Sequence, residues 1–330
     1  FMNMPMKAII KKDLKNILAR GRVRAICISK ERGTEKQAVP EGHFLVDFGI
    51  QGDAHAGNWH RQVSLLSYDK VEAFNQRGAG VADGAFGENL VVEGIDFASL
   101  PVGTILCAGT VQLEMTQIGK ECHSHCAIYK RMGECIMPRE GVFARVIQEG
   151  MIRPGDEMTA FAPQADRPFH AAVITLSDKG ARGERKDESG PAAVRLLKEA
   201  GYQVAETLLI ADEPELLKTH LIRLADSRQV DLIITSGGTG FSLRDQTPEA
   251  TLAVADRNAP GIAEAIRAQS MAITNRAMLS RGVSVIRGKT LIINLPGSPK
   301  AVKESLGFIL DGLSHGLAVL RGSAGECARS

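Results

Sequence analysis

The sequence lacks an excess of charge of either sign and any long apolar run. Its 330 residues carry 40 Lys and Arg against 38 Asp and Glu, a formal net charge of +2, which gives no electrostatic basis for nucleic-acid binding. No apolar run reaches the roughly 20 residues of a membrane span, and the N-terminal stretch lacks the apolar core and cleavage site of a signal peptide. With 6 Cys and no such signal, a disulfide framework is not expected. We therefore predict a cytoplasmic protein without nucleic-acid or membrane partners.

Length and composition predict a globular chain of about two domains, because 330 residues exceed a typical single domain and 44% of them are hydrophobic. Prolines and polar residues interrupt the apolar pattern at 161–168, where we expect the linker. The predicted domains are then 23–160 and 169–322, with an N-terminal extension at 1–22 and a C-terminal tail at 323–330.

The second half contains apolar runs that end in small-residue turns. The runs at 171–176, 203–210, 231–235 and 290–295 have the length and the β-branched content of strands that are buried on both faces. Helix-starting residues follow each turn, and in a parallel sheet with right-handed crossovers all these turns fall at the carboxyl ends of the strands. The pattern predicts a three-layer α/β domain with a mainly parallel sheet and one crevice at that edge.

The most informative motif is TSGGTGFSLRDQTPEAT at 235–251. Its glycines permit positive φ and let a ligand approach the main chain, and Thr247 and Pro248 are the expected N-cap and first residue of a helix. Arg244 beside Asp245 offers a cation for phosphate and a carboxylate for a hard metal ion. The alternative is an ordinary glycine-rich turn with a surface ion pair.

A second turn, in IRGKTLIINLPGSPK at 286–300, repeats this pattern, with Ser298 as the expected N-cap and Pro299 as the first helical residue. Backbone N–H groups at such helix starts bind anions, so two of them in one domain predict a nucleotide-sized, phosphate-bearing substrate. The residues that we expect in this crevice are Ser177, Asp178, Ser189, Gly190, Asp212, Ser236, Gly237, Gly238, Thr239, Gly240, Arg244, Asp245, Pro296, Gly297 and Ser298.

These motifs resemble the molybdopterin adenylyltransferase family of the Mog and MoaB type, which includes the G domain of gephyrin. The resemblance covers roughly 169–322 and implies adenylylation of molybdopterin by Mg-ATP, with release of pyrophosphate. It implies that Asp212 and Asp245 bind Mg²⁺ and serve catalysis, and that the glycine loop and the 295–299 turn bind the substrates. It also implies a homotrimer.

The first half has short β-rich runs separated by glycine turns, at 24–29, 44–48, 62–67, 89–92 and 104–118. Few helical repeats lie between them, apart from a possible helix near 69–76, so this half is predicted to be a compact β-barrel. The motifs GIQGDAHAG, GAFGENL and RPGD, which begin at residues 49, 84 and 153, resemble a MOSC domain.

The MOSC resemblance implies a cysteine that carries sulfur as a persulfide, without pyridoxal phosphate, or that touches the molybdenum cofactor. The matching residue is Cys122, and the implied partners are a cysteine desulfurase or a molybdoenzyme. Nearby cations would lower the pKa of its thiol, whereas Glu121, which stands where the family has a proline, would raise it. Of the barrel motif, Asp53 is expected to cap the turn, and His55 either lines a pocket or supports that turn.

Other roles stay open for the cysteines. Zinc binding is an alternative for the cluster of Cys122, His123, His125, Cys126 and Cys135, and Cys126 and Cys135 can also be simple buried or surface thiols. Cys27 and Cys107 lie in apolar strand patterns and are expected in the core.

Together the two halves predict a two-domain enzyme of molybdenum cofactor biosynthesis. One alternative is a carrier or scaffold that binds molybdopterin without catalysis. The other is a MOSC sulfur transferase that is regulated by a nucleotide-binding module.

Overall fold

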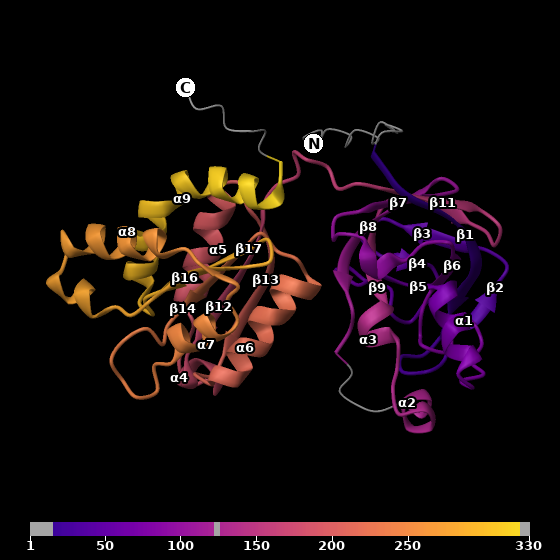
Figure 1. The fold of residues 1–330 in the computed structure, drawn as a ribbon, viewed down its shortest axis with the longest axis horizontal. Coiled ribbons are helices and arrows are strands. Elements are labelled where there is room, and N and C mark those ends of the chain that lie inside the picture. Colours follow the sequence, from indigo (N-terminus) through magenta and orange to yellow (C-terminus); the bar gives the residue numbers. More distant parts are fainter. Residues whose placement is uncertain (1–15, 122–125, 324–330) are drawn as a thin grey trace. The chain divides into compact units, whose positions relative to one another are not determined.

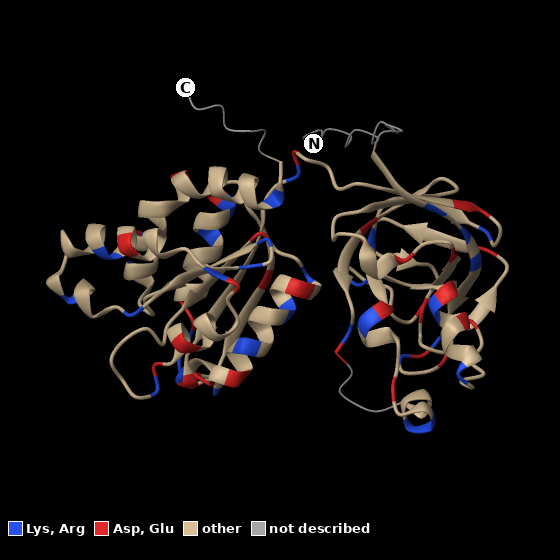
Figure 2. Cartoon of the chain, in the orientation of Figure 1, with Lys and Arg blue, Asp and Glu red and all other residues tan. Residues whose placement is uncertain are grey.

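The computed structural model describes residues 16–121 and 126–323. The chain divides into two compact units between Gln164 and Ala165, which we call the barrel unit and the α/β unit (Figure 1). Charged residues of both signs are spread over each unit (Figure 2). No helix in the described ranges is long and apolar enough to cross a membrane.

In the barrel unit, seven strands of the described chain close into a ring in the order β1-β11-β7-β8-β9-β5-β6, because β6 pairs back onto β1. The neighbours are antiparallel except β5 and β6, which are parallel, and β2 extends the sheet beside β1. This confirms the predicted β-barrel. The strands are β1 (Ile17–Ile28), β2 (Gln37–Val39), β5 (Val63–Ser67), β6 (Leu90–Glu93), β7 (Ile105–Ala108), β8 (Val111–Ile118), β9 (Val142–Gln148) and β11 (Glu157–Phe161).

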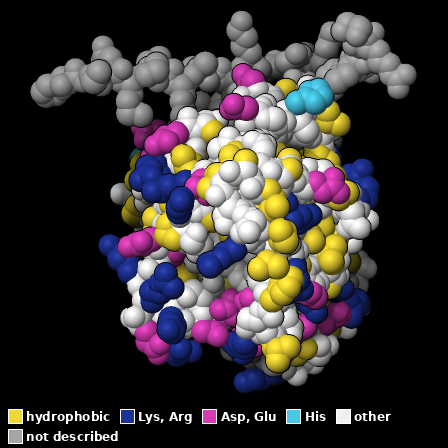
Figure 3. All heavy atoms as spheres, turned by 90° about the vertical axis from the view of Figure 1, so that its left-hand side faces the viewer, with side chains coloured by type: hydrophobic (Ala, Val, Ile, Leu, Met, Phe, Trp, Pro, Cys, Tyr) yellow, Lys and Arg dark blue, Asp and Glu magenta, His cyan; other side chains and the backbone are white. Residues whose placement is uncertain are grey.

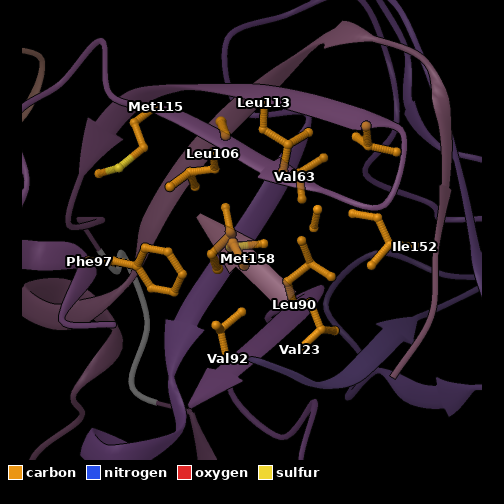
Figure 4. Close-up of a cluster of buried hydrophobic side chains, with 14 of the residues drawn as sticks. Val23, Val63, Leu90, Val92, Phe97, Leu106, Leu113, Met115, Ile152 and Met158 are labelled. Atoms are coloured by element: carbon orange, nitrogen blue, oxygen red, sulfur yellow. The ribbon is translucent and has the colours of Figure 1, made fainter. Parts of the chain in front are cut away.

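Apolar side chains fill the barrel because alternate residues of each strand point inward. Val23, Leu90, Leu113 and Met158 are at most 1% exposed and lie together inside it (Figure 4). Burial of each such side chain stabilises the fold by about 1.5–3 kcal/mol. The remaining elements of this unit are β3 (Gly42–Leu45), β4 (Gly49–Ile50), β10 (Gly150–Ile152), α1 (Tyr68–Gln76), η2 (Phe97–Ser99), α2 (Ala127–Met132) and α3 (Met137–Glu140).

The helix predicted near 69–76 is α1. The short helices α2 and α3, each of six residues or fewer, were not predicted. Segments this short have too few turns to produce a helical period in the sequence.

The α/β unit is built on a sheet that has six strands among the described residues, in the order β13-β12-β14-β17-β16-β15. The first four are parallel, and β16 and β15 continue the sheet in antiparallel fashion. This confirms the mainly parallel sheet, and the antiparallel edge is an addition that was not predicted. The strands are β12 (His170–Leu176), β13 (Gln203–Ile210), β14 (Leu232–Ser236), β15 (Arg257–Asn258), β16 (Ser284–Arg287) and β17 (Thr290–Leu295).

Helices cover both faces of this sheet, which gives three layers. Successive residues of a strand serve opposite faces: Ile234 of β14 packs in the cluster with α5, α8 and α9, whereas Ile233 packs with α6 and α7. Figure 3 shows one face of this unit, where hydrophobic side chains lie among charges of both signs. The helices are α4 (Asp178–Ala181), α5 (Ser189–Glu199), α6 (Pro214–Ile222), η3 (Arg223–Ser227), α7 (Thr247–Ala253), α8 (Pro260–Met271), η4 (Asn275–Leu279) and α9 (Pro299–Arg321).

A buried aspartate ties the start of this unit to its last helix. Asp231, directly before β14, pairs with Arg167 (Nη1 to Oδ2, 3.1 Å) and with Arg321 at the end of α9 (Nη2 to Oδ2, 2.9 Å). Arg321 also donates to the carbonyl oxygens of Arg167 and Pro168. The segment that leads into β12 is therefore held by contacts within the α/β unit.

Candidate active site

The four parallel strands of the α/β unit send their following loops to one edge of the sheet. A cavity of about 350 Å³ lies at this edge, within the range of about 300–1,000 Å³ that is typical of small-molecule pockets. Predicted residues that line it are Ser177, Ser189, Asp212, Gly237, Gly238, Asp245, Gly297 and Ser298. The crevice expected from the strand ends is thus present as one cavity.

The other predicted residues do not line this cavity: Asp178, Gly190, Ser236, Thr239, Gly240, Arg244 and Pro296. The cavity is also lined by residues that were not predicted, among them Thr175, Arg185, Lys186, Asp187 and Glu188. The segment at 185–188 carries two cations directly before two carboxylates and a helix start, a visible signal that pointed to this loop.

The loop of residues 237–240, which we call the glycine loop, requires glycine because it packs closely against neighbouring backbone. Gly237 and Gly238 have φ of 107° and 65°, which favours glycine. A Cβ at Gly237 would come within 2.5 Å of the Leu176 carbonyl oxygen, and one at Gly297 within 3.3 Å of the Gly237 Cα. Gly237 also donates its N–H to the Leu295 carbonyl oxygen at 3.1 Å. The loops after β14 and β17 therefore form one wall.

Asp212 is anchored to the loop after β12 by two reciprocal hydrogen bonds. The Asp178 N–H donates to Asp212 Oδ2, and the Asp212 N–H donates to Asp178 Oδ1, both at 3.1 Å. Burial raises the pKa of Asp212, and the nearby carboxylates of Asp178 and Asp245 raise it further. Within the described part of the chain, Oδ1 of Asp212 accepts no hydrogen bond, so it remains available to a ligand.

Asp245 is held in a similar way by its own loop. Its Oδ2 accepts from the Ser242 N–H at 3.1 Å, and its N–H donates to the Ser242 carbonyl oxygen at 2.9 Å. A Cβ at Gly240 would stand 2.9 Å from this carboxylate oxygen, so glycine gives it room. Among the described residues, Oδ1 of Asp245 also has no hydrogen-bond donor.

The donor set of these two aspartates fits Mg²⁺. Each carboxylate uses one oxygen for a backbone anchor and keeps the other, and their mutual repulsion is relieved by a cation. No group of three or more His, Cys, Asp or Glu in the described ranges has the arrangement of a metal site. Mg²⁺ commonly takes one or two carboxylates and completes its shell with water and substrate phosphates.

Arg244, predicted to hold phosphate, forms a surface ion pair in the structure. Its Nη2 lies 2.8 Å from Asp178 Oδ2 and 3.2 Å from Glu213 Oε1. The hydrogen bond from the Asp212 backbone and the Arg244 guanidinium together lower the pKa of Asp178. The pair is exposed, so water screens it and an anionic ligand can compete for the guanidinium.

The helix starts around the cavity agree with the sequence in part. Ser298 is the N-cap of α9, where its Oγ accepts from the Ala301 N–H at 3.1 Å, and Pro299 is the first helical residue, as predicted. The prediction that Thr247 is an N-cap is wrong by one residue, because Gln246 precedes α7. Thr247 is instead the first residue of α7, and its N–H donates to the Gly238 carbonyl oxygen of the glycine loop at 3.2 Å.

The barrel unit has its own polar cluster, in which Asp53 and Lys36 are buried and paired with each other. Asp53 caps its turn by accepting from the His55 N–H at 3.2 Å, while its other oxygen accepts from the Ser29 N–H and from Lys36 Nζ at 2.5 Å. His55 Nδ1 lies 3.3 Å from Lys36 Nζ, and burial, followed by the Lys36 charge, lowers the pKa of His55. Lys36 was not predicted, because it lies in a loop before β2 that carries no motif.

The cysteine predictions have different outcomes. Cys122, His123 and His125 lie outside the described residues. Cys27 is buried in β1 as expected, and burial, with Glu88 and Asp83, raises the pKa of its thiol to about 12. Cys107 and Cys135 are half-buried, and Cys126 is exposed.

Comparisons with known proteins match the two units separately. A family model described as "Probable molybdopterin binding domain" matches residues 172–315, and the MOSC domain model matches 52–159. The molybdopterin adenylyltransferase of Helicobacter pylori is 38% identical over 157 residues, which cover 47% of this chain and 89% of that protein. The enzyme of the same name from Escherichia coli K12 is 41% identical over 153 residues, covering 46% of this chain and 77% of that protein.

Among solved structures, the molybdopterin biosynthesis enzyme MoaB of Thermus thermophilus is 47% identical. The matched region covers 47% of this chain and 97% of the MoaB chain, and the TM-score is 0.45. The two resemblances inferred from the sequence motifs are confirmed by the two family models.

Proposed function

The chain belongs, through its α/β unit, to the molybdopterin adenylyltransferase family, and on this basis we propose that this unit adenylylates molybdopterin with Mg-ATP. The observation that carries the proposal is the meeting of Asp212 and Asp245 with the glycine loop in one cavity. Each carboxylate keeps one oxygen free of protein hydrogen bonds among the described residues, directly beside a turn that lets phosphates approach the main chain.

The proposed reaction is an in-line displacement at the α-phosphorus of ATP. A phosphate oxygen of molybdopterin forms a bond to this phosphorus, and the bond to the bridging oxygen of the β-phosphate breaks, so pyrophosphate leaves with the electron pair. Two anions must come together, and the protein therefore acts by positioning and by charge stabilisation rather than by proton transfer. The wall of glycine loops positions the nucleotide phosphates, and Arg185 and Lys186 attract them.

Asp212 and Asp245 would hold Mg²⁺, which, when bound, withdraws charge from the phosphates and screens the approach of the nucleophile. The charge of the lining supports this requirement. Among the described residues that line the cavity, two carry a positive charge, Arg185 and Lys186, and four carry a carboxylate, Asp187, Glu188, Asp212 and Asp245. A triphosphate that entered without a cation would meet a net negative surface.

The direct test is to incubate the purified protein with molybdopterin, ATP and Mg²⁺ and to follow adenylylated pterin and pyrophosphate. We expect both products in equal amounts, and none when EDTA is present. Binding of molybdopterin without product would instead support a carrier or scaffold. Nucleotide binding that changes only sulfur transfer by the barrel unit would support a regulatory module.

For the barrel unit we propose a role in sulfur carriage or in binding the molybdenum cofactor, with Cys122 as the reactive thiol. Of the described cysteines, Cys27 is poorly suited to carry sulfur, because its side chain is fully buried and burial raises the pKa of its thiol to about 12. Mass spectrometry after loading by a cysteine desulfurase should place the extra sulfur on Cys122. Labelling of the exposed Cys126 alone would contradict this assignment.

We further propose that the protein works in the cytoplasm as a homotrimer, as the family resemblance implies. Sedimentation equilibrium tests the assembly, and the mass of a single 35.4-kDa chain would contradict it.

A further inference from the structure

Arg281, in the loop between η4 and β16, is bonded to both ends of the loop that carries Asp245. Its Nε donates to the Gly240 carbonyl oxygen at 2.8 Å, and its Nη2 donates to the carbonyl oxygen of Asp245. Gly240 and Asp245 are the first and last residues of this turn, whose inner hydrogen bonds hold the Asp245 carboxylate. One guanidinium therefore fixes the span of the turn.

Two further contacts extend this anchor beyond the turn. The backbone N–H of Arg281 donates to the Thr239 carbonyl oxygen at 2.9 Å, and its Nη1 pairs with Glu249 in the first turn of α7. Arg281 thus touches the chain before, within and after the turn. A side chain that is 34% exposed and makes this many bonds is ordered by them rather than by packing alone.

We infer that Arg281 is a positioning residue for the proposed adenylyl transfer: it holds the 240–245 turn so that the Asp245 carboxylate stays at the cavity that Asp212 also lines. The inference rests on the proposed function. Arg281 does not line the cavity, so it acts through Asp245 rather than on the substrate. The planar guanidinium donates from separate nitrogens in fixed directions, which a lysine ammonium does not reproduce at two acceptors.

A second arginine of the same unit offers a matched control. Arg287 on β16 makes a bidentate pair with Asp226 and donates to the Val254 carbonyl oxygen at 2.9 Å. It makes a similar number of bonds, and none of them reaches the glycine loop or the cavity. Loss of either arginine removes comparable structural bonding, but only loss of Arg281 releases Asp245.

The test compares R281A, R281K and R287A in the full chain. Hydrogen exchange at residues 240–246 and the Kd of Mn²⁺ measured by electron paramagnetic resonance in the presence of a non-hydrolysable ATP analogue report on the turn without turnover. For R281A we expect faster exchange, a Mn²⁺ Kd raised about tenfold, and a kcat lowered by about 10²-fold, a loss that a misplacement of about 1 Å can cause. R281K should recover only part of each loss.

R287A should keep wild-type exchange in the turn, wild-type Mn²⁺ affinity and wild-type kcat, even if its melting temperature falls. Equal losses in R287A, or unchanged exchange and Mn²⁺ affinity in R281A, would overturn the inference. If R281A does not fold, R281K serves as the test: smaller losses in exchange protection, Mn²⁺ affinity and kcat would support the inference, and wild-type values of exchange and Mn²⁺ affinity would overturn it. Failure of the proposed function itself is distinct, because the wild type would then make no adenylylated pterin while exchange and Mn²⁺ affinity still report on the turn.

Discussion

Two aspartates, Asp53 in the barrel unit and Asp245 in the α/β unit, each close a tight turn, but they differ in how many of their carboxylate oxygens accept hydrogen bonds from the protein. Both oxygens of Asp53 accept hydrogen bonds from the protein, and its side chain is fully buried against Lys36. Asp245 keeps one oxygen without a donor among the described residues and lines a cavity.

The difference follows from the two architectures. A closed barrel has its polar turns folded over a filled core, so a buried carboxylate must be neutralised inside the protein. An open parallel sheet ends at a row of loops, and the groups there can remain unsatisfied until a ligand arrives. The same residue type is therefore structural in one unit and a candidate for binding in the other.

The largest effect is expected for Asp245→Asn. This change keeps the size of the side chain but removes the charge that would hold Mg²⁺, so we expect adenylyl transfer to fall about a thousandfold, equivalent to roughly 4 kcal/mol in the transition state. Steady-state kinetics measures the rate of adenylyl transfer, and circular dichroism checks that the variant is folded. Asp311→Asn, an exposed carboxylate on α9 away from the cavity, is the control. Near-normal transfer by folded Asp245→Asn would refute the assignment.

Asp53→Ala is expected to destabilise the barrel without affecting adenylyl transfer. It leaves Lys36 buried without its partner, and breaking such a pair costs about 3–5 kcal/mol in the free energy of unfolding. The single Trp of the chain, Trp59, is in the barrel unit, so its fluorescence during denaturation reports on this unit.

Two variants sharpen this measurement. Glu157→Ala, which removes an exposed pair with Arg20, should change the free energy of unfolding by no more than about 0.5 kcal/mol. Lys36→Met combined with Asp53→Ala should recover part of the loss, since it removes the buried ammonium group that Asp53→Ala alone leaves unpaired. A cost for Asp53→Ala as small as that of the exposed control would show that the pair does not hold the barrel together.

A smaller effect is expected from pH, through Glu88. This carboxyl is fully buried and accepts from the N–H groups of Gly84 and Phe86, and burial raises its pKa from 4.5 to about 7. The folded barrel therefore binds a proton that the unfolded chain releases, and its stability should fall by about 2–3 kcal/mol as pH rises from 4.5 to about 7. The difference between wild type and Glu88→Gln in Trp59-monitored unfolding isolates this dependence; parallel curves across that range would contradict it.

The smallest effect is expected from separating the units. A fragment that begins at Ala165 keeps the pairing of Asp231 with Arg167 and Arg321, so it should fold and transfer adenylyl groups at a rate within about twofold of the full chain. A soluble fragment without activity would show that the barrel unit completes the pterin site.

What the sequence predicted well was local. The parallel strands follow from short apolar runs, and the shared edge follows from the turn residues after each run, as Gly237 and Pro296 show. In the barrel, the glycine turns and alternating runs were enough to predict the fold class. Ser298 was found because a cap, a proline and a strand are adjacent in the sequence.

What the sequence missed depends on contacts between distant residues. Arg281 is important only because folding brings it to Gly240 and Asp245, about 40 residues earlier. Lys36 and Glu88 have their roles because they are buried, and the burial of a single loop residue cannot be predicted from the residues beside it in the sequence. The partners of Arg244 are likewise set by the fold, which places Asp178 and Glu213 beside it, and its binding of phosphate stays a prediction.

The closure of the barrel also sets an order of events during synthesis. β1 pairs with β11 in a register that joins Ile17 to Phe161, so the ring cannot close until nearly the whole unit has left the ribosome. Such long-range pairing is slow compared with local contacts. Until β11 arrives, this edge of β1 has no partner strand and can pair with strands of other chains, so the order of synthesis itself creates a period of aggregation risk.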